Sequence, residues 1–230
     1  MSIFCKKYAK LITVLFSFSL ILFLLTLSIN IGSEDFNFYK NFSIEHNLKN
    51  QVGVSQDNLE KMYKSLQGQI KNGDEKEIKQ YFNDREVSHM KDVYKLFNLN
   101  RNINRIMMVI VIISSTLVYY NKEDKVQNSK YIINYLLIIL VGFLILGGIV
   151  YYNFESSFIK FHELFFNNDL WLLNPETDIM IRMLPQEFFM SIAFKIFRTF
   201  IFNMGIIIIS LTIYIFVKKR GKKNVSVQWK

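Results

Sequence analysis

Four long apolar stretches, separated by charged segments, constrain this 230-residue chain more than any other feature. No charged residue lies within 11–31, 131–154 or 199–217. Because a helix of about 20 residues crosses the ~30 Å hydrocarbon core of a bilayer, these stretches predict membrane-spanning helices. The fourth stretch, 106–120, is short, so we begin its span at Ile103 and expect Arg105 to snorkel towards the interface.

The predicted fold class is therefore an all-α integral membrane protein with four transmembrane helices. We place the spans at 11–31, 103–120, 131–153 and 196–217. An extracytoplasmic helical domain is expected at 32–102, and an extracytoplasmic segment with short outer helices at 154–195. The cytoplasmic parts are then the N-terminus 1–10, a loop at 121–130 and a basic tail at 218–230.

The first apolar stretch also has the basic flank of a secretory signal peptide. Its apolar run is longer than the ~7–15 residues of a typical signal, and Ser28–Ser33 lacks a small-x-small cleavage pattern. We therefore expect a retained anchor. Cys5 precedes this run and is the single cysteine, which excludes an internal disulfide and predicts no role for the thiol.

The net charge of +9 suggests a nucleic-acid partner until its distribution is considered. With a cytoplasmic N-terminus, the cytoplasmic segments hold twelve of the 28 basic residues but two of the 19 acidic ones. The positive-inside rule accounts for this bias and fixes the orientation. We expect a multi-pass membrane protein with both termini cytoplasmic, and no nucleic-acid partner.

The first outer segment contains a predicted amphipathic helix. Ser55 has the position of an N-cap, and apolar residues follow it at three-to-four spacing. The spacing predicts that this face packs either on the membrane surface or on the other outer segment. The apolar positions are Met62, Tyr63, Leu66 and Ile70.

The second outer segment combines an aromatic helix with proline-marked turns. Phe158, Phe161, His162 and Phe165 recur at helical spacing, which predicts a helix that continues from the third span with His162 on its aromatic face. Asn174–Pro175 and Leu184–Pro185 each have the pattern of a helix start, with proline at the first helical position.

Two of the three histidines, His89 and His162, lie in different outer segments and are therefore expected on one face of the membrane. On its own, such a histidine is more often an amphipathic surface residue, and His46 keeps that interpretation. The aromatic stripe around His162 is in the same way more typical of packing than of an acyl groove. A pair of imidazoles at a lipid surface nevertheless indicates acid–base chemistry.

The residues around both histidines resemble a known family. The blocks 86–97 (EVSHMKDVYKLF) and 161–171 (FHELFFNNDLW), followed by Asn174–Pro175, Asp178 and 184–189 (LPQEFF), are similar to the lipoprotein intramolecular transacylases of Gram-positive bacteria. The resemblance extends over nearly the whole chain, including four spans with an outer domain between the first two.

The resemblance implies a membrane acyltransferase. This family moves the sn-2 acyl chain of a lipoprotein's diacylglyceryl-cysteine onto the α-amine of the same cysteine, which gives a lyso-form lipoprotein. The expected partners are diacylglyceryl-modified bacterial lipoproteins and membrane lipid. Because an ester becomes a more stable amide, no cofactor and no metal is expected, and the chain contains no glycine-rich phosphate loop.

The reaction requires a base for the amine and a proton for the leaving glyceryl oxygen. We assign the base to His89 and the second role, carbonyl polarisation or protonation, to His162, and the reverse assignment stays open. Asp92 and Asp169 lie on matching helical faces and are candidates for orienting an imidazole, or are solvated surface residues. Trp171 is either a wall of the site or an interfacial anchor.

Three alternatives remain at this point. His89, His162, Glu163 and Asp169 are metal-ligand types, but no HExxH or comparable spacing joins them. An outer-leaflet phospholipid acyltransferase or lipase would use similar groups. A non-enzymatic four-span sensor or accessory protein would need neither histidine.

Overall fold

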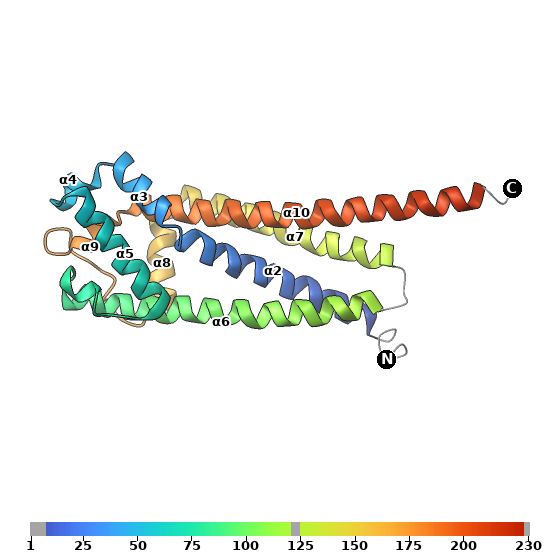
Figure 1. Cartoon of the computed structure of the whole chain (residues 1–230), viewed down its shortest axis with the longest axis horizontal. Helices are drawn as coiled ribbons and strands as arrows, with labels where there is room; N and C mark the ends of the chain where they lie inside the picture. Colours follow the sequence, from blue (N-terminus) through green and yellow to red (C-terminus); the bar gives the residue numbers. More distant parts are fainter. Residues whose placement is uncertain (1–7, 121–124, 228–230) are drawn as a thin grey trace. The chain divides into compact units, whose positions relative to one another are not determined.

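The computed structural model describes the backbone of residues 8–120 and 125–227, with side chains up to Arg220. All regular structure in these ranges is helical (Figure 1). The N-terminal residues that include Cys5, and the loop residues 121–124, lie outside the described ranges. The elements are α2 (Ala9–Ser33), α3 (Phe36–Glu45), α4 (Leu48–Val52), α5 (Gln56–Asn72), the 3-10 helix η1 (Ile78–Gln80), α6 (Asp84–Tyr120), α7 (Lys125–Tyr152), α8 (Phe154–Phe165), α9 (Ile179–Met183) and α10 (Gln186–Val227).

Four of these helices, α2, α6, α7 and α10, are long and apolar enough to cross a membrane. The predicted fold class, an all-α protein with four candidate spanning helices, is confirmed. In the most apolar 18-residue stretch of α7, only 11% of the residues are buried inside the protein. Most of this stretch therefore presents its side chains outward. Lipid is the medium that accepts such a surface.

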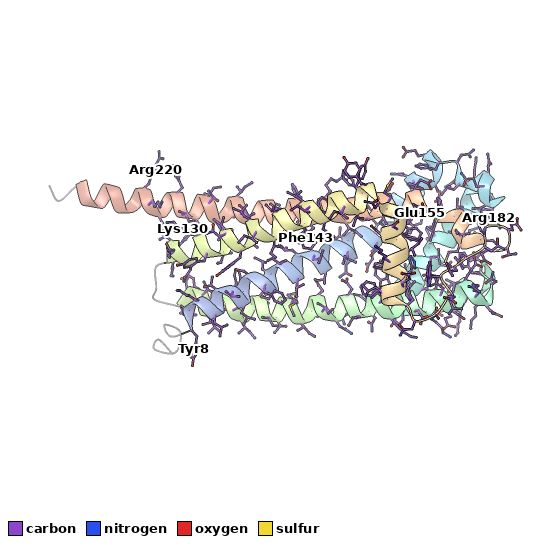
Figure 2. The ribbon with its side chains drawn as sticks, turned by 180° about the vertical axis from the view of Figure 1, so that it is seen from behind. Tyr8, Lys130, Phe143, Glu155, Arg182 and Arg220 are labelled. Carbon is purple, nitrogen blue, oxygen red and sulfur yellow. The ribbon has the colours of Figure 1, made fainter. Side chains whose placement is uncertain are left out.

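The chain divides into two compact units, and each long helix contributes to both. The first unit contains residues 1–28, 103–147 and 197–230. Its core packs α2, α7 and α10 together, and the ring of Phe143 lies 4.7 Å from that of Phe200 (Figure 2). Asn104 of α6 donates hydrogen bonds to the Phe23 carbonyl (3.1 Å) and the Thr26 hydroxyl (2.9 Å) of α2. Such interhelical bonds hold apolar helices together where no water competes.

The second unit contains residues 29–102 and 148–196 and forms around α5. Ser55 caps α5 by accepting a hydrogen bond from the Asn58 N–H, as its sequence position predicts. The apolar face of α5 packs on both outer segments, because Met180, Met183 and Phe188 share its core. Of the two possibilities that the sequence left open, the membrane surface and the other outer segment, the face therefore packs on the other outer segment. The predicted core positions Met62, Tyr63, Leu66 and Ile70 are all buried.

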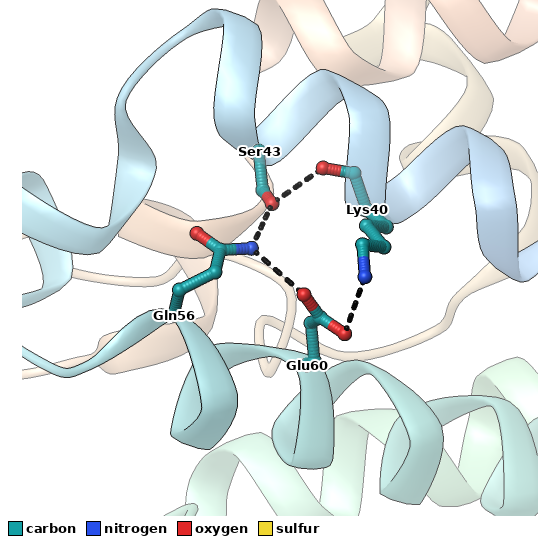
Figure 3. Close-up of polar contacts among 4 residues, drawn as sticks. All are labelled: Lys40, Ser43, Gln56 and Glu60. Atoms are coloured by element: carbon teal, nitrogen blue, oxygen red, sulfur yellow. Dashed lines mark hydrogen bonds and ion pairs between the residues drawn. The ribbon is translucent and has the colours of Figure 1, made fainter.

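Polar contacts align α3 with α5 inside this unit (Figure 3). Lys40 forms an ion pair with Glu60 at 3.2 Å. The Gln56 amide donates to the other Glu60 oxygen (3.3 Å) and to the Ser43 hydroxyl (3.1 Å), which itself donates to the Lys40 carbonyl. The four side chains therefore fix the register between two short helices whose apolar contacts alone allow sliding.

Tyr63 connects α5 to the end of α9. Its buried hydroxyl donates a 2.7 Å hydrogen bond to the Met183 carbonyl. We expect Tyr63→Phe to lower the free energy of unfolding by about 1–2 kcal/mol, because a buried carbonyl loses its donor. Thermal unfolding in detergent micelles measures this change. Tyr151→Phe is the control, since that ring is 62% exposed, and an equal loss in both variants would contradict the prediction.

Two details of the sequence interpretation are wrong. Helix α8 does not continue α7, because Asn153 leaves helical geometry (φ −128°, ψ 46°) between them. Asn174–Pro175 starts a turn instead of a helix, since the Asn174 side chain accepts from the Glu176 N–H and the next helix begins at Ile179. Leu184–Pro185 does precede a helix, α10.

Candidate active site

His89 lies in the second turn of α6, whose start is fixed by a capping box. The Asn83 side chain accepts from the Glu86 N–H (3.0 Å), and the Glu86 carboxylate accepts from the Asn83 N–H (2.8 Å). This reciprocal pairing satisfies two donors at the helix N-terminus. His89 follows Glu86 by three residues, so its imidazole lies on the same helical face, one turn after this cap.

Glu86 also joins α6 to the second outer segment. Its carboxylate is only 1% exposed, and its other oxygen accepts a 2.7 Å hydrogen bond from the Met180 N–H at the start of α9. Beside it, the Asn83 amide donates to Asp178 (2.8 Å), which also accepts from the Asn174 N–H (2.7 Å). Sequence reasoning missed this function of Glu86. The Asn-x-x-Glu spacing signalled its capping function, whereas its contact with Met180 has no signal in the sequence.

His162 lies in the last turn of α8 and is buried among aromatic rings. Its Nδ1 is 2.7 Å from the Phe158 carbonyl oxygen, one helical turn earlier. A carbonyl only accepts, so Nδ1 carries the proton and donates. In the neutral ring the lone pair is therefore on Nε2, which makes this nitrogen the basic one.

The structure brings the two predicted histidines together. The ring centroids of His89 and His162 are 6.2 Å apart. Phe166 contacts both rings, at 5.3 Å from His89 and 5.5 Å from His162. Trp171 stacks on His162 at 4.9 Å and 28°, so it forms a wall of this cluster. Aromatic contacts of this kind hold the imidazoles in place and displace water.

Both imidazoles are poor at holding a positive charge. Burial and, as the smaller cause, the nearby His162 together lower the pKa of His89 to about 4, and the Asp92 carboxylate acts in the opposite direction. Burial also lowers the pKa of His162, although its bond to the Phe158 carbonyl acts in the opposite direction. At neutral pH the pair is therefore uncharged and free to accept a proton. Nδ1 of His89 is buried and has no hydrogen-bond partner among the described residues.

These pKa shifts predict how stability depends on pH. An unfolded histidine titrates near pH 6.5, so between about pH 6.5 and 4 the unfolded chain binds a proton that folded His89 refuses. The free energy of unfolding should therefore fall as the pH is lowered, by up to ~1.4 kcal/mol per pH unit for one group. When unfolding is measured in detergent across this pH range, the free energy of unfolding of His89→Gln should depend less steeply on pH than that of the wild type. An equal slope in His89→Gln and the wild type would contradict the shift at His89.

Neither predicted orienting carboxylate bonds to an imidazole. The Asp92 oxygens accept from Lys95 (2.8 Å) and from the Asn168 amide (2.9 Å). Asp169 is exposed, and because α8 ends at Phe165 it shares no helical face with His162. What Asp169 contributes is its backbone carbonyl, which accepts a hydrogen bond from Arg85 of α6.

A pocket of about 330 Å³ lies beside Phe166, the ring that also contacts both imidazoles. Phe166 belongs both to this pocket and to the aromatic cluster around the imidazoles. The described residues contain no group of three or more His, Cys, Asp or Glu side chains that could hold a metal ion, so the metal alternative gains no support here. The pocket is lined by Asp92, Lys95, Leu96, Leu99, Phe165, Phe166, Asn167 and Asn168.

Comparison with known proteins identifies the family. The sequence model of the lipoprotein intramolecular transacylase, Lit, matches residues 14–189. The chain belongs to the Lit family. It is therefore an integral membrane acyltransferase that acts on lipoproteins, as the resemblance in the sequence predicts. The search of curated proteins found no significant match.

Solved Lit structures share this architecture. The Lit of Bacillus cereus is 25% identical and superposes with a TM-score of 0.78, over 92% of this chain and 97% of that one. A variant of the same Bacillus cereus protein with a histidine-to-arginine mutation is 24% identical, with a TM-score of 0.76 over 95% and 96% of the two chains. The likeness includes both compact units, since it extends over almost the full length.

Proposed function

We propose that this Lit protein moves the sn-2 acyl chain of a diacylglyceryl-modified lipoprotein onto the α-amine of the same N-terminal cysteine. The observation that carries the proposal is the pair of uncharged imidazoles, 6.2 Å apart, on two outer helices. Donor and acceptor belong to one molecule, and effective molarities of about 10⁵–10⁸ M make folding of the lipid head the main task of the protein. The product amide is more stable than the ester.

His162 is the general base in this proposal, the reverse of our first assignment from the sequence. Its Nδ1 donates to the Phe158 carbonyl, so Nε2 presents a lone pair to the substrate. Its pKa is lowered by burial, which keeps it unprotonated at neutral pH. His89 has the lower pKa and is the weaker base, and this favours a hydrogen-bonding role towards the carbonyl or the leaving oxygen.

The reaction balances with these two groups alone. The neutral α-amine attacks the ester carbonyl carbon, which forms the C–N bond and places negative charge on the carbonyl oxygen. Nε2 of His162 takes the proton that the amine loses. As the bond between carbon and the glyceryl oxygen breaks, this proton passes to the glyceryl oxygen, and a neutral hydroxyl and an amide remain.

The aromatic cluster has a second function, which is to limit hydrolysis. Water competes with the amine for the same ester carbon, so the site must be dry around the reacting atoms. The ring centroid of Phe158 lies 4.3 Å, and that of Phe161 5.5 Å, from the centroid of the His162 ring. Phe166 and Trp171 also contact this ring. These rings make direct transfer to the amine faster than transfer to water.

We place this site on the extracytoplasmic face, with both termini in the cytoplasm. The excess of lysine and arginine in 1–10, 121–130 and 218–230 supports this orientation. Residues 29–102 and 148–196 then form the extracytoplasmic unit. The substrate is exposed on the same face, because the lipid anchor of a lipoprotein holds its cysteine at the membrane surface.

The test uses purified protein and a synthetic diacylglyceryl-cysteine lipopeptide with a free amine. Mass spectrometry should detect an isomer of unchanged mass that carries an N-acyl group and one free glyceryl hydroxyl. Release of free fatty acid would instead indicate a lipase, and transfer to an added phospholipid would indicate a phospholipid acyltransferase. An unchanged lipopeptide would favour the sensor alternative and refute the proposal.

A further inference from the structure

The pocket beside Phe166 has a polar and an apolar end. Asp92 and Lys95 on α6, with Asn168 opposite, form the polar end. Leu96 and Leu99 follow along α6 in the direction of its apolar stretch, and Phe165 and Phe166 close the other side. A molecule with a charged group next to a lipid group matches this gradient.

Asp92 has the right position to receive the charged group of such a molecule. It is the one acidic residue among the described residues that line the pocket, and its side chain is 22% exposed. It follows His89 by three residues, so both lie on the same face of α6. A cation held by Asp92 therefore lies within one helical turn of His89.

Asp92 has two partners in the described part of the chain, of which Lys95 is the exchangeable one. Asn168 donates to one oxygen at 2.9 Å and belongs to the segment that closes the pocket. Lys95 donates to the other oxygen at 2.8 Å, but its side chain is 75% exposed. An ammonium group on a flexible, exposed stem leaves an ion pair at little cost.

The proposed substrate brings a competing cation. A free α-amine has a pKa of about 7.7–8.0, so most molecules arrive as the ammonium ion near pH 7. Moving an unpaired ammonium into a pocket beside aromatic rings is costly unless a carboxylate accompanies it. A carboxylate that already binds one primary ammonium has the chemistry to bind another.

We propose that Asp92 binds the α-ammonium group of the substrate cysteine and that Lys95 occupies this position in the empty pocket. The proposal rests on the function given above, because it assumes a lipopeptide with a free N-terminal amine. The diacylglyceryl group then lies along Leu96, Leu99 and Phe165. Asp92 is thus a positioning residue. It holds the ammonium ion until one proton has passed to solvent, and the neutral amine then attacks and gives its next proton to His162.

Binding can be measured without turnover. The probes are two ether-linked dialkylglyceryl-cysteine peptides, one with a free amine and one N-acetylated, titrated into the detergent-solubilised protein. We expect the wild type to prefer the free amine by about three- to tenfold, and Asp92→Asn to lose that preference. Lys95→Gln should enlarge it, because the competing cation is gone. Ether links prevent acyl transfer, so this result is separate from the fate of the proposed reaction.

The two variants are expected to change the preference for the free amine in opposite directions, and this distinguishes a positioning function of Asp92 from a purely structural ion pair. If the Asp92–Lys95 pair only stabilises the fold, both variants weaken the two probes alike, and the proposal is wrong. It is equally wrong if Asp92→Asn keeps the wild-type preference for the free amine. Lys79→Gln is the matched control, since it removes a lysine from another ion pair, at 3.1 Å from Glu75. Thermal unfolding of each variant verifies that the protein is folded during the titration.

Discussion

His162→Gln should lower the rate of acyl transfer by about 10²- to 10⁴-fold, the range that a general base contributes. Glutamine keeps a donor and an acceptor of similar reach but takes up no proton at neutral pH. The wild-type ring presents a basic Nε2 because Nδ1 is committed to the Phe158 carbonyl. The rate is measured by mass spectrometry of the lipopeptide product under single-turnover conditions, which exclude effects on product release.

Two controls make this result specific. His46→Gln changes an exposed histidine that stacks on Phe42, so the rate should stay at the wild-type value. The ether-linked peptide should still bind to His162→Gln, because the loss concerns proton transfer and not affinity. Full activity in His162→Gln would refute the assignment of the base, and loss of binding together with activity would point to a structural function of the ring.

Glu86→Ala should be the most destabilising single change near the site, by about 3–5 kcal/mol. The carboxylate is buried, and its removal leaves the Asn83 and Met180 N–H groups without their acceptor. The Met180 N–H is buried, and a buried donor without a partner costs about 1–3 kcal/mol. Loss of the capping contact at the exposed Asn83 costs about 0.5–2 kcal/mol more, and the missing side chain adds a cavity. The midpoint temperature of thermal unfolding and the acyl-transfer rate should fall together, since α6 and α9 lose their connection beside His89.

The matched control for Glu86 is Glu155→Ala. Both glutamates lie in the first turn of a helix, but Glu155 is exposed at the start of α8 (Figure 2). The control should change the free energy of unfolding by less than about 0.5 kcal/mol. If Glu86→Ala has a similarly small effect, the buried carboxylate does not hold the two outer segments together.

The sequence was sufficient for the features that depend on local pattern. Uncharged runs predicted the four long helices, and Ser55 with the spacing that follows predicted α5 and its buried face. Helix interruptions were harder to predict. Nothing in the apolar run before Asn153 marks a break, because asparagine is tolerated within helices as well as at their ends.

The site was predicted only as far as its histidines. Their positions indicated chemistry, but a helical-face argument wrongly extended α8 to Asp169, since the pattern does not reveal where a helix ends. Glu86 and Asn168 were missed for another reason. Their functions depend on contacts with Met180 and Asp92, and such long-range pairs have no periodicity in the sequence.

The bond between Glu86 and Met180 has a consequence for biosynthesis. Its partners are 94 positions apart in the chain. At about 5–20 residues per second, the ribosome needs about 5–20 s to make the second partner after the first. During this interval the Glu86 carboxylate must stay hydrated, and the start of α6 lacks its final anchor. The nascent protein therefore passes through a stage in which one histidine exists without the other, and catalytic competence arises only after the second outer segment has been made.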